Sequence, residues 1–185
     1  MLTMTPGTVY WFTGLSGAGK TTVAKLFSQR LRDRRAALGH AGPSVVFLDG
    51  DILREVYGDD LGHSIADRRR VAGRNSRLCG MLAHQGVDVV IATISMFHDC
   101  RDWNRTHLPH YREIYLRVPL DVLHRRDQKG LYSRALRGEQ ADVLGVNLVP
   151  EEPLAPDLVV DNDGTSSPEA VVDLCIAALL SDEGA

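Results

Sequence analysis

The chain has 185 residues, of which 44% are hydrophobic, with 21 basic and 24 acidic residues and a formal charge of -3. This length suits one hydrophobic core and is short for two, so we expect a single domain over residues 1–185. The slight negative charge supplies no basic field for nucleic acid or an anionic membrane surface, and we expect neither as a partner.

The cysteines and the apolar runs bear on the cellular compartment. Cys79, Cys100 and Cys175 are far apart, which fits neither a zinc site nor a disulfide framework. No apolar run approaches the ~18 residues of a membrane span, and the first residues lack the basic and apolar regions of a signal peptide. We therefore expect a cytoplasmic protein.

Strand-like runs alternate with segments of helical spacing along the chain. The strand-like runs are TVYWFT (8–13), VVFLD (45–49), DVVIAT (88–93), EIYLRV (113–118) and DLVVD (157–161). Several are apolar at consecutive positions, which is typical of strands covered on both faces. Helical spacing extends over about 20–38, 67–85, 120–127 and 168–180. The alternation predicts an α/β fold, a three-layer sandwich whose five-stranded parallel sheet has helices on both faces.

Three further stretches carry structural expectations. The first helical segment ends in a basic run, which we interpret as a solvated face at the carbonyl end of the helix: Arg30, Arg32, Arg34 and Arg35. The proline-rich stretch 149–156 is expected to form a rigid surface loop. Ser166-Ser167-Pro168-Glu169 predicts a serine cap at the start of the last helix.

A glycine-rich stretch, GLSGAGKTT, joins the first strand-like run to the first helical segment. It fills the pattern G-x-x-x-x-G-K-[ST], in which backbone N–H groups surround phosphate oxygens, the lysine reaches the outer phosphates and the hydroxyl ligates Mg²⁺. The fold class is therefore that of a P-loop NTPase, and we expect ATP and Mg²⁺ as cofactors. The residues expected to bind the nucleotide are Gly14, Leu15, Ser16, Gly17, Ala18, Gly19, Lys20, Thr21 and Thr22. The guanine-reading pattern N-K-x-D is absent, and no room remains for the large domains of motors, so a small kinase is the leading class.

Two carboxylates and an arginine follow the second strand-like run, in Asp49-Gly50-Asp51-Ile52-Leu53-Arg54. Open α/β sheets bind ligands at this edge. One carboxylate here can hold magnesium, and the other can orient or deprotonate an attacking hydroxyl. We assign Thr21 and Asp49 to the metal. The same stretch also suits a turn followed by a helix cap, so alone it does not decide the function.

Five motifs taken together resemble adenylylsulfate kinase. They are GLSGAGKTT, LDGD-x-LR, DLG-x-S-x-ADR (60–68), IS-x-F (94–97) followed by Arg101, and RD-x-KGLY (126–132). The resemblance covers about residues 9 to 161. It implies a P-loop kinase, usually a homodimer, that phosphorylates the ribose 3′-hydroxyl of adenosine 5′-phosphosulfate with MgATP.

The resemblance also implies roles for individual residues. Asp51 lies near the 3′-hydroxyl, Phe97 stacks on the acceptor base, and Ser95 matches the position of a phosphoserine intermediate, for which direct transfer is the simpler alternative. The implied catalytic residues are Lys20, Asp51, Ser95 and Lys129, the last in a mobile lid. Those implied for the acceptor are Asp51, Arg54, His63, Arg68, Phe97, Arg101 and Lys129. Arg126 is expected near the ATP adenine.

The acceptor side departs from the family pattern. His63 replaces a phenylalanine, Val71 an asparagine, and Leu144 the phenylalanine of F-T-G-I-D. Base stacking is worth ~1–3 kcal/mol per base, so the loss of these rings would weaken binding of adenosine 5′-phosphosulfate unless the His63 ring replaces the stacking. The identity of the acceptor nucleotide therefore stays open. A divergent branch phosphorylates cytidine diphosphoramidate, and the runs 101–105 and 143–146 look closer to it. A catalytically silent nucleotide-binding module and a small-metabolite kinase of another P-loop branch are the alternatives of other classes.

Overall fold

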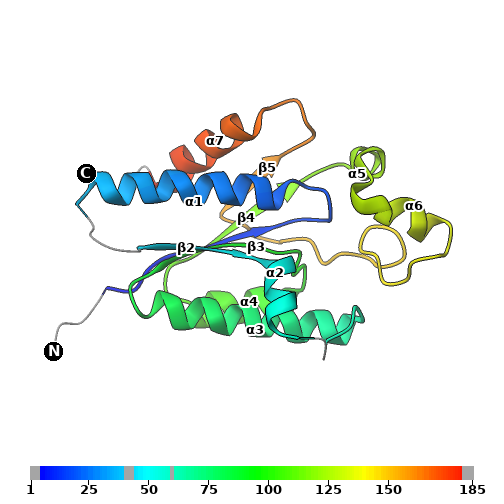
Figure 1. Ribbon diagram of the computed structural model, residues 1–185, viewed down its shortest axis with the longest axis horizontal. Helices are drawn as coiled ribbons and strands as arrows, with labels where there is room; N and C mark the ends of the chain where they lie inside the picture. Colours follow the sequence, from blue (N-terminus) through cyan, green and yellow to red (C-terminus); the bar gives the residue numbers. More distant parts are fainter. Residues whose placement is uncertain (1–4, 40–43, 59–60, 181–185) are drawn as a thin grey trace.

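The computed structural model describes residues 5–39, 44–58 and 61–180 (Figure 1). Asp60, which opens the predicted DLG motif, lies outside the described residues. None of the helices in the described ranges is long and apolar enough to cross a membrane.

Five parallel strands form one sheet in the order β2-β3-β1-β4-β5. Their bounds are β1 Val9–Thr13, β2 Val45–Asp49, β3 Asp88–Ala92, β4 Tyr111–Arg117 and β5 Leu158–Asp161. β1 is the central strand, with Val9 in register with Val89 of β3 and Tyr111 of β4. The predicted five-stranded parallel sheet is confirmed.

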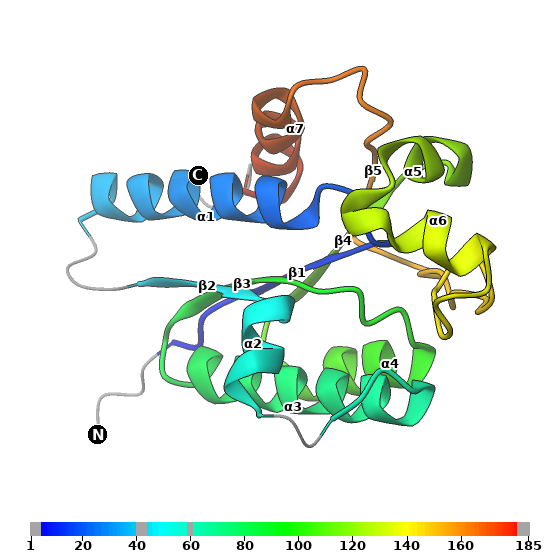
Figure 2. The same ribbon diagram turned by 45° about the vertical axis from the view of Figure 1, so that its right-hand side comes forward.

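Helices cover both faces of the sheet, as predicted. They are α1 Lys20–Ala37, α2 Gly50–Val56, α3 Ile65–Ala83, α4 His98–His107, α5 Leu120–Arg126, α6 Leu131–Leu136 and α7 Pro168–Leu180, with a 3-10 helix, η1, over Gln128–Gly130. α1 and α7 lie on one face, and α3 and α4 lie on the other (Figures 1 and 2). α5 and α6 extend beyond one end of the sheet.

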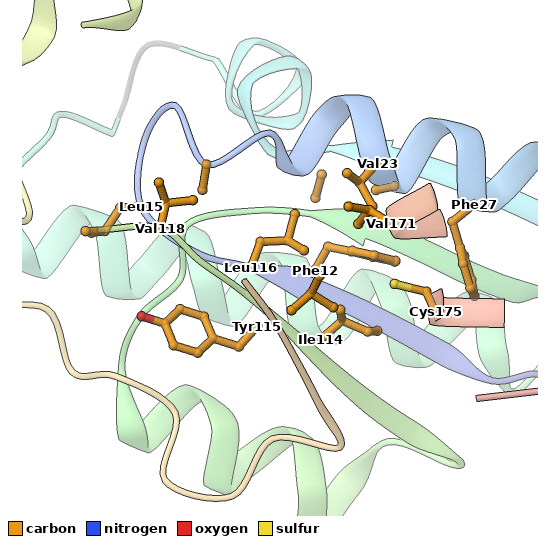
Figure 3. Close-up of a cluster of buried hydrophobic side chains, with 14 of the residues drawn as sticks. Phe12, Leu15, Val23, Phe27, Ile114, Tyr115, Leu116, Val118, Val171 and Cys175 are labelled. Atoms are coloured by element: carbon orange, nitrogen blue, oxygen red, sulfur yellow. The ribbon is translucent and has the colours of Figure 1, made fainter. Parts of the chain in front are cut away.

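The alternation of side chains along β1 supplies both hydrophobic cores. Tyr10 and Phe12 join the cluster under α1 and α7, whereas Val9 and Trp11 join the cluster under α3 and α4. Phe12 packs edge-on against Phe27 of α1, with ring centroids 5.3 Å apart (Figure 3). A run of consecutive apolar residues is therefore buried on both faces, which explains why the strand lacks a polar side.

The basic run that ends α1 corrects the interpretation of a solvated face. Its first arginine, Arg30, makes an exposed ion pair with Asp173 of α7. The others reach neighbouring elements: Arg32 donates to the Val45 carbonyl, Arg34 to the Leu180 carbonyl, and Arg35 to the Asp88 carboxylate at 2.8 Å. These contacts join the end of α1 to β2, α7 and β3.

The proline-rich stretch 149–156 forms no regular helix or strand in the structure. Arg101 and Arg105 of α4 donate to the carbonyls of Glu151 and Ala155, each at 2.6 Å. α4 thereby holds the loop at two points. The predicted cap of α7 is confirmed, since the Ala170 N–H donates to the Ser167 hydroxyl at 3.3 Å.

Candidate active site

A cavity of about 500 Å³ opens at the carboxyl ends of the central strands, between the glycine-rich loop, the start of α2, the β3–α4 segment and the α5–α6 region. Most of the predicted site residues line it: Ser16, Gly17, Gly19, Lys20, Thr21, Thr22, Asp49, Asp51, Arg54, His63, Arg68, Ser95, Phe97 and Lys129. Gly14, Leu15, Ala18, Arg101 and Arg126 are not among its lining residues. Leu15 and Ala18 are buried in the core under α1, on the inner side of the loop.

The glycine-rich loop turns through three glycines with positive φ, Gly14 at 148°, Gly17 at 77° and Gly19 at 84°. A Cβ at Gly14 would lie 2.5 Å from the Leu116 carbonyl oxygen, and one at Gly19 would lie 2.7 Å from Nδ2 of Asn162. Only glycine fits these positions without strain. The loop therefore lies close to the ends of β4 and β5.

Side chains from distant segments hold the carbonyl groups of this loop. Asn162 Nδ2 donates to the Ala18 carbonyl at 2.8 Å, and the Tyr132 hydroxyl donates to the Ser16 carbonyl at 2.8 Å. Arg126 donates to the Gly17 carbonyl at 3.1 Å, so it braces the loop from outside the cavity. The sequence patterns gave no role to Asn162 or to Tyr132, although Tyr132 ends the RD-x-KGLY motif. The one signal for Asn162 is that it directly follows the last strand.

Lys20 opens α1 with its ammonium group close to the loop, donating to the Leu15 carbonyl at 2.8 Å. Burial lowers the pKa of Lys20 to about 8, and the nearby Asp51 and Asp49 carboxylates oppose this shift. Anionic phosphate groups favour a protonated lysine. The placement suits a lysine that meets the outer phosphates of a nucleotide.

Thr21 and Asp49 present their oxygen atoms side by side. The Thr21 hydroxyl donates to Asp49 Oδ2 at 2.8 Å, while Oδ1 of the same carboxylate accepts from the Asp51 N–H at 2.9 Å and caps α2. Asp49 is thus both a helix cap and a wall of the cavity. A hydroxyl and a carboxylate are the hard oxygen ligands that Mg²⁺ prefers. Among the described residues no cluster of three or more His, Cys, Asp or Glu could hold a metal alone, so phosphate or water oxygens would complete the coordination.

Asp51 faces a sharply turned segment that carries Lys129. The Lys129 ammonium lies 3.4 Å from Asp51 Oδ2, and both side chains are exposed. Asp127, Lys129 and Gly130 all have positive φ, at 32°, 60° and 64°. The Asp127 carboxylate accepts from the Tyr132 N–H at 2.9 Å, which fixes the start of α6 after these turns. The turned backbone places the Lys129 ammonium beside the Asp51 carboxylate.

Two arginines, Arg54 and Arg68, also line the cavity. Arg54 donates to the Leu61 and Gly62 carbonyls at 3.2 and 2.7 Å, and Arg68 donates to the His63 carbonyl at 2.8 Å. Partial burial and the positive charges of Arg54 and Arg68 lower the pKa of the His63 imidazole below its ordinary value. Both guanidinium groups therefore order the 61–63 segment and present positive charge at the cavity.

The β3–α4 segment contributes a strained serine. Ser95 is buried, has φ 21°, and its hydroxyl lies 2.9 Å from that of Thr93. Non-glycine residues with positive φ are costly and cluster at functional sites. Phe97, two residues further along the chain, also lines the cavity. Lining residues to which the sequence patterns gave no role are Thr93, Gln128, Leu131, Arg134, Gln140 and Val143. Gln128 and Leu131 lie within RD-x-KGLY, and the other four lie outside the five motifs.

Arg101 corrects an expectation, because the structure does not bring it to the cavity. Its side chain is buried and its Nε pairs with Glu113 Oε1 at 2.8 Å. Another nitrogen donates to the Glu151 carbonyl. Burial raises the pKa of the Glu113 carboxyl, and the charges of Arg101 and Arg105 oppose that shift. The Arg101 side chain is committed to internal partners and is not free for a substrate.

A parallel sheet, a glycine-rich loop and a lysine and threonine at the start of α1 together define a P-loop phosphotransferase. Comparison with known proteins narrows this class. The family model for adenylylsulphate kinase matches residues 6–161, and the chain belongs to this family. It is an ATP-dependent kinase.

Two curated relatives and one solved structure illustrate the similarity. The chain is 42% identical over 173 residues to an adenylyl-sulfate kinase of Chloroflexus aurantiacus, covering 94% of this chain and 89% of the relative. It is 38% identical over 174 residues to a cytidine diphosphoramidate kinase of Campylobacter jejuni, covering 92% and 95%. The structure of the Mycobacterium tuberculosis APS kinase in complex with AMPPNP and APS superposes with a TM-score of 0.82 at 32% identity, covering 94% of this chain and 98% of that one.

Proposed function

We propose that the protein transfers the γ-phosphoryl group of ATP to the ribose 3′-hydroxyl of a nucleotide, with adenosine 5′-phosphosulfate as the best match. One observation carries the proposal. A single cavity is lined by Lys20, Thr21 and Asp49 at the phosphate loop and also by Asp51 and the acceptor-side Arg54. A triphosphate and an anionic nucleotide can therefore meet at Asp51.

The residues suit direct in-line transfer. The Asp51 carboxylate accepts the proton of the ribose 3′-hydroxyl while the hydroxyl oxygen forms a bond to the γ-phosphorus of ATP. The bond between the γ-phosphorus and the oxygen that bridges it to the β-phosphate breaks, and ADP is released. Thr21 and Asp49 would hold Mg²⁺, which neutralises charge on the phosphates. Lys20 and Lys129 supply positive charge from two sides. Ser95 then needs no covalent role, because phosphoryl transfer chiefly requires positioning and charge stabilisation.

A second acceptor, cytidine diphosphoramidate, is favoured by specific observations. Val71, Val143 and Leu144 give the acceptor side an aliphatic lining, and the family asparagine and phenylalanine are replaced at two of these positions. His63 lines the same cavity and can donate a hydrogen bond to a base. The chain is 38% identical to the Campylobacter jejuni cytidine diphosphoramidate kinase and 42% identical to the Chloroflexus aurantiacus adenylyl-sulfate kinase. Because these identities are so similar, they support the second acceptor almost as well as the first.

ADP release from MgATP tests both acceptors. Adenosine 5′-phosphosulfate and cytidine diphosphoramidate are compared at equal low concentration, with Asp51→Ala as the blank. The compound with the higher kcat/KM is the acceptor. ATP binding without ADP release above the blank for either compound would instead support a silent nucleotide-binding module.

We further propose that the chain works as one kinase domain in a cytoplasmic homodimer. The three free cysteines are all buried, which suits a reducing compartment. The family resemblance supports the dimer. Light scattering should give twice the 20.3 kDa chain mass, and a monomer mass at working concentration would overturn the dimer.

A further inference from the structure

A cluster of charged side chains lies behind Phe97. This phenylalanine lines the cavity yet is only 5% exposed, and it is the residue immediately before α4. The guanidinium carbon of Arg69, from α3, lies 4.6 Å from the centroid of the Phe97 ring. The Arg69 guanidinium thus covers one face of the Phe97 ring, and the part of the ring that it leaves uncovered can line the cavity.

Two carboxylates from other segments fix Arg69. Its guanidinium pairs with Asp99 and, at 2.7 Å, with Glu151 Oε1. The second oxygen of Glu151 accepts from the His98 N–H at 2.5 Å, and Asp99 accepts from the Cys100 N–H at 2.9 Å. The carboxylates that hold Arg69 therefore also hold the first turn of α4, which begins directly after Phe97.

The loop that provides Glu151 is itself held in place. Arg101 donates to the Glu151 carbonyl at 2.6 Å and is paired with the buried Glu113. The buried ion pair that removes Arg101 from the cavity thus supports the network around Arg69. Arg69, Asp99 and Glu151 do not line the cavity, whereas Phe97 does, so Phe97 is the direct link from Arg69 to a bound molecule.

We infer that Arg69 is a positioning residue that sets the Phe97 ring against the base of the acceptor nucleotide; this inference rests on the proposed function. A planar guanidinium held by two carboxylates restricts the ring and the α4 turn before the base arrives. Without the Arg69 guanidinium, the Phe97 ring and the first turn of α4 become ordered only when the base binds, and the entropy cost of this ordering weakens acceptor affinity. Among the described residues, no hydrogen bond or ion pair joins the glycine-rich loop to Arg69, Asp99 or Glu151, so ATP affinity should stay unchanged.

Steady-state kinetics of Arg69→Met and Arg69→Lys test the inference with whichever acceptor the wild type turns over faster. Arg69→Met should raise the acceptor KM by about 3- to 30-fold with a small change in kcat and none in the ATP KM. Arg69→Lys should restore the acceptor KM only in part, because lysine keeps the positive charge but lacks the planar guanidinium that pairs with two carboxylates. Arg77→Met is the matched control: Arg77 lies on the same helix and over another ring, Trp103, at 5.2 Å, away from the cavity.

A double-mutant cycle with Phe97→Leu separates positioning from a structural role. In the Phe97→Leu background, Arg69→Met should change the acceptor KM by less than about twofold, because the ring through which it acts is gone. An equal increase in both backgrounds, a parallel rise in the ATP KM, or an Arg69→Met enzyme that matches Arg77→Met would overturn the inference. Wild-type protein that releases no ADP with either acceptor would instead overturn the proposed function, and the role of Arg69 would fall with it.

Discussion

Gly19→Ala tests whether the geometry of the glycine-rich loop controls nucleotide binding. Gly19 has φ 84° and caps α1. An alanine there adopts a left-handed conformation at a cost of about 1–2 kcal/mol. Its Cβ would also lie 2.7 Å from Asn162 Nδ2, and displacing Asn162 breaks the hydrogen bond to Ala18, worth about 0.5–1.5 kcal/mol. The free energy of unfolding should fall by about 1.5–3.5 kcal/mol in all.

Gly39→Ala is the control, because it isolates the contact with Asn162 from backbone strain. Gly39 has φ 82°, and among the described residues no atom lies within 4 Å of a Cβ built there. Urea unfolding should show only the conformational cost for this variant, and calorimetry should show unchanged ATP affinity. For Gly19→Ala we expect the Kd for ATP to rise by about tenfold or more, since relief of the clash moves the loop N–H groups. Equal stability and equal ATP affinity in the two variants would refute the reasoning.

Three further predictions concern the catalytic end of the cavity. Asp51→Asn keeps the side-chain shape but removes the base, so stopped assays should show kcat about 10²–10⁴-fold lower with the Kd for ATP unchanged; near-normal kcat would exclude a proton-accepting role. EDTA should abolish ADP release, and Thr21→Val should require about tenfold more Mg²⁺ for half-maximal rate; an unchanged requirement would remove Thr21 from the metal site. The pKa of His63 is lowered by partial burial and by Arg54 and Arg68, so its NMR signals should titrate at lower pH than those of an ordinary histidine. An anionic acceptor offsets the arginine charges, so acceptor binding should raise the pKa of His63. At a pH near that pKa, binding should therefore be accompanied by proton uptake by the imidazole. An unchanged His63 pKa on acceptor binding would show that the acceptor binds elsewhere.

Local sequence patterns were enough to predict the sheet and the phosphate loop. Residues 9–12 of β1 are all apolar because Tyr10 and Phe12 enter one core while Val9 and Trp11 enter the other. The glycine-rich motif carries its own backbone requirements, since its three glycines with positive φ lie within six residues. Such features depend on neighbours in the chain, and the sequence shows those neighbours directly.

The roles of charged residues could not be predicted in the same way. Arg101 was assigned to the substrate, yet its partners Glu113 and Glu151 lie 12 and 50 residues away in sequence. Arg35 was assigned to solvent, yet it pairs with Asp88, 53 residues away. An arginine needs a carboxylate or a carbonyl wherever the fold provides one, and only the packed structure shows whether that partner is internal.

Identification of the reaction product is the most direct test of the central claim. Wild-type protein, MgATP and the preferred acceptor are incubated, and the new phosphate is located by phosphorus–proton correlation NMR. We predict one new phosphomonoester, coupled to the ribose H3′, with one ADP formed per product molecule and product formation at least about 100-fold slower with Asp51→Asn. A phosphate on any other position, or ADP formed without a phosphorylated nucleotide, would contradict the account.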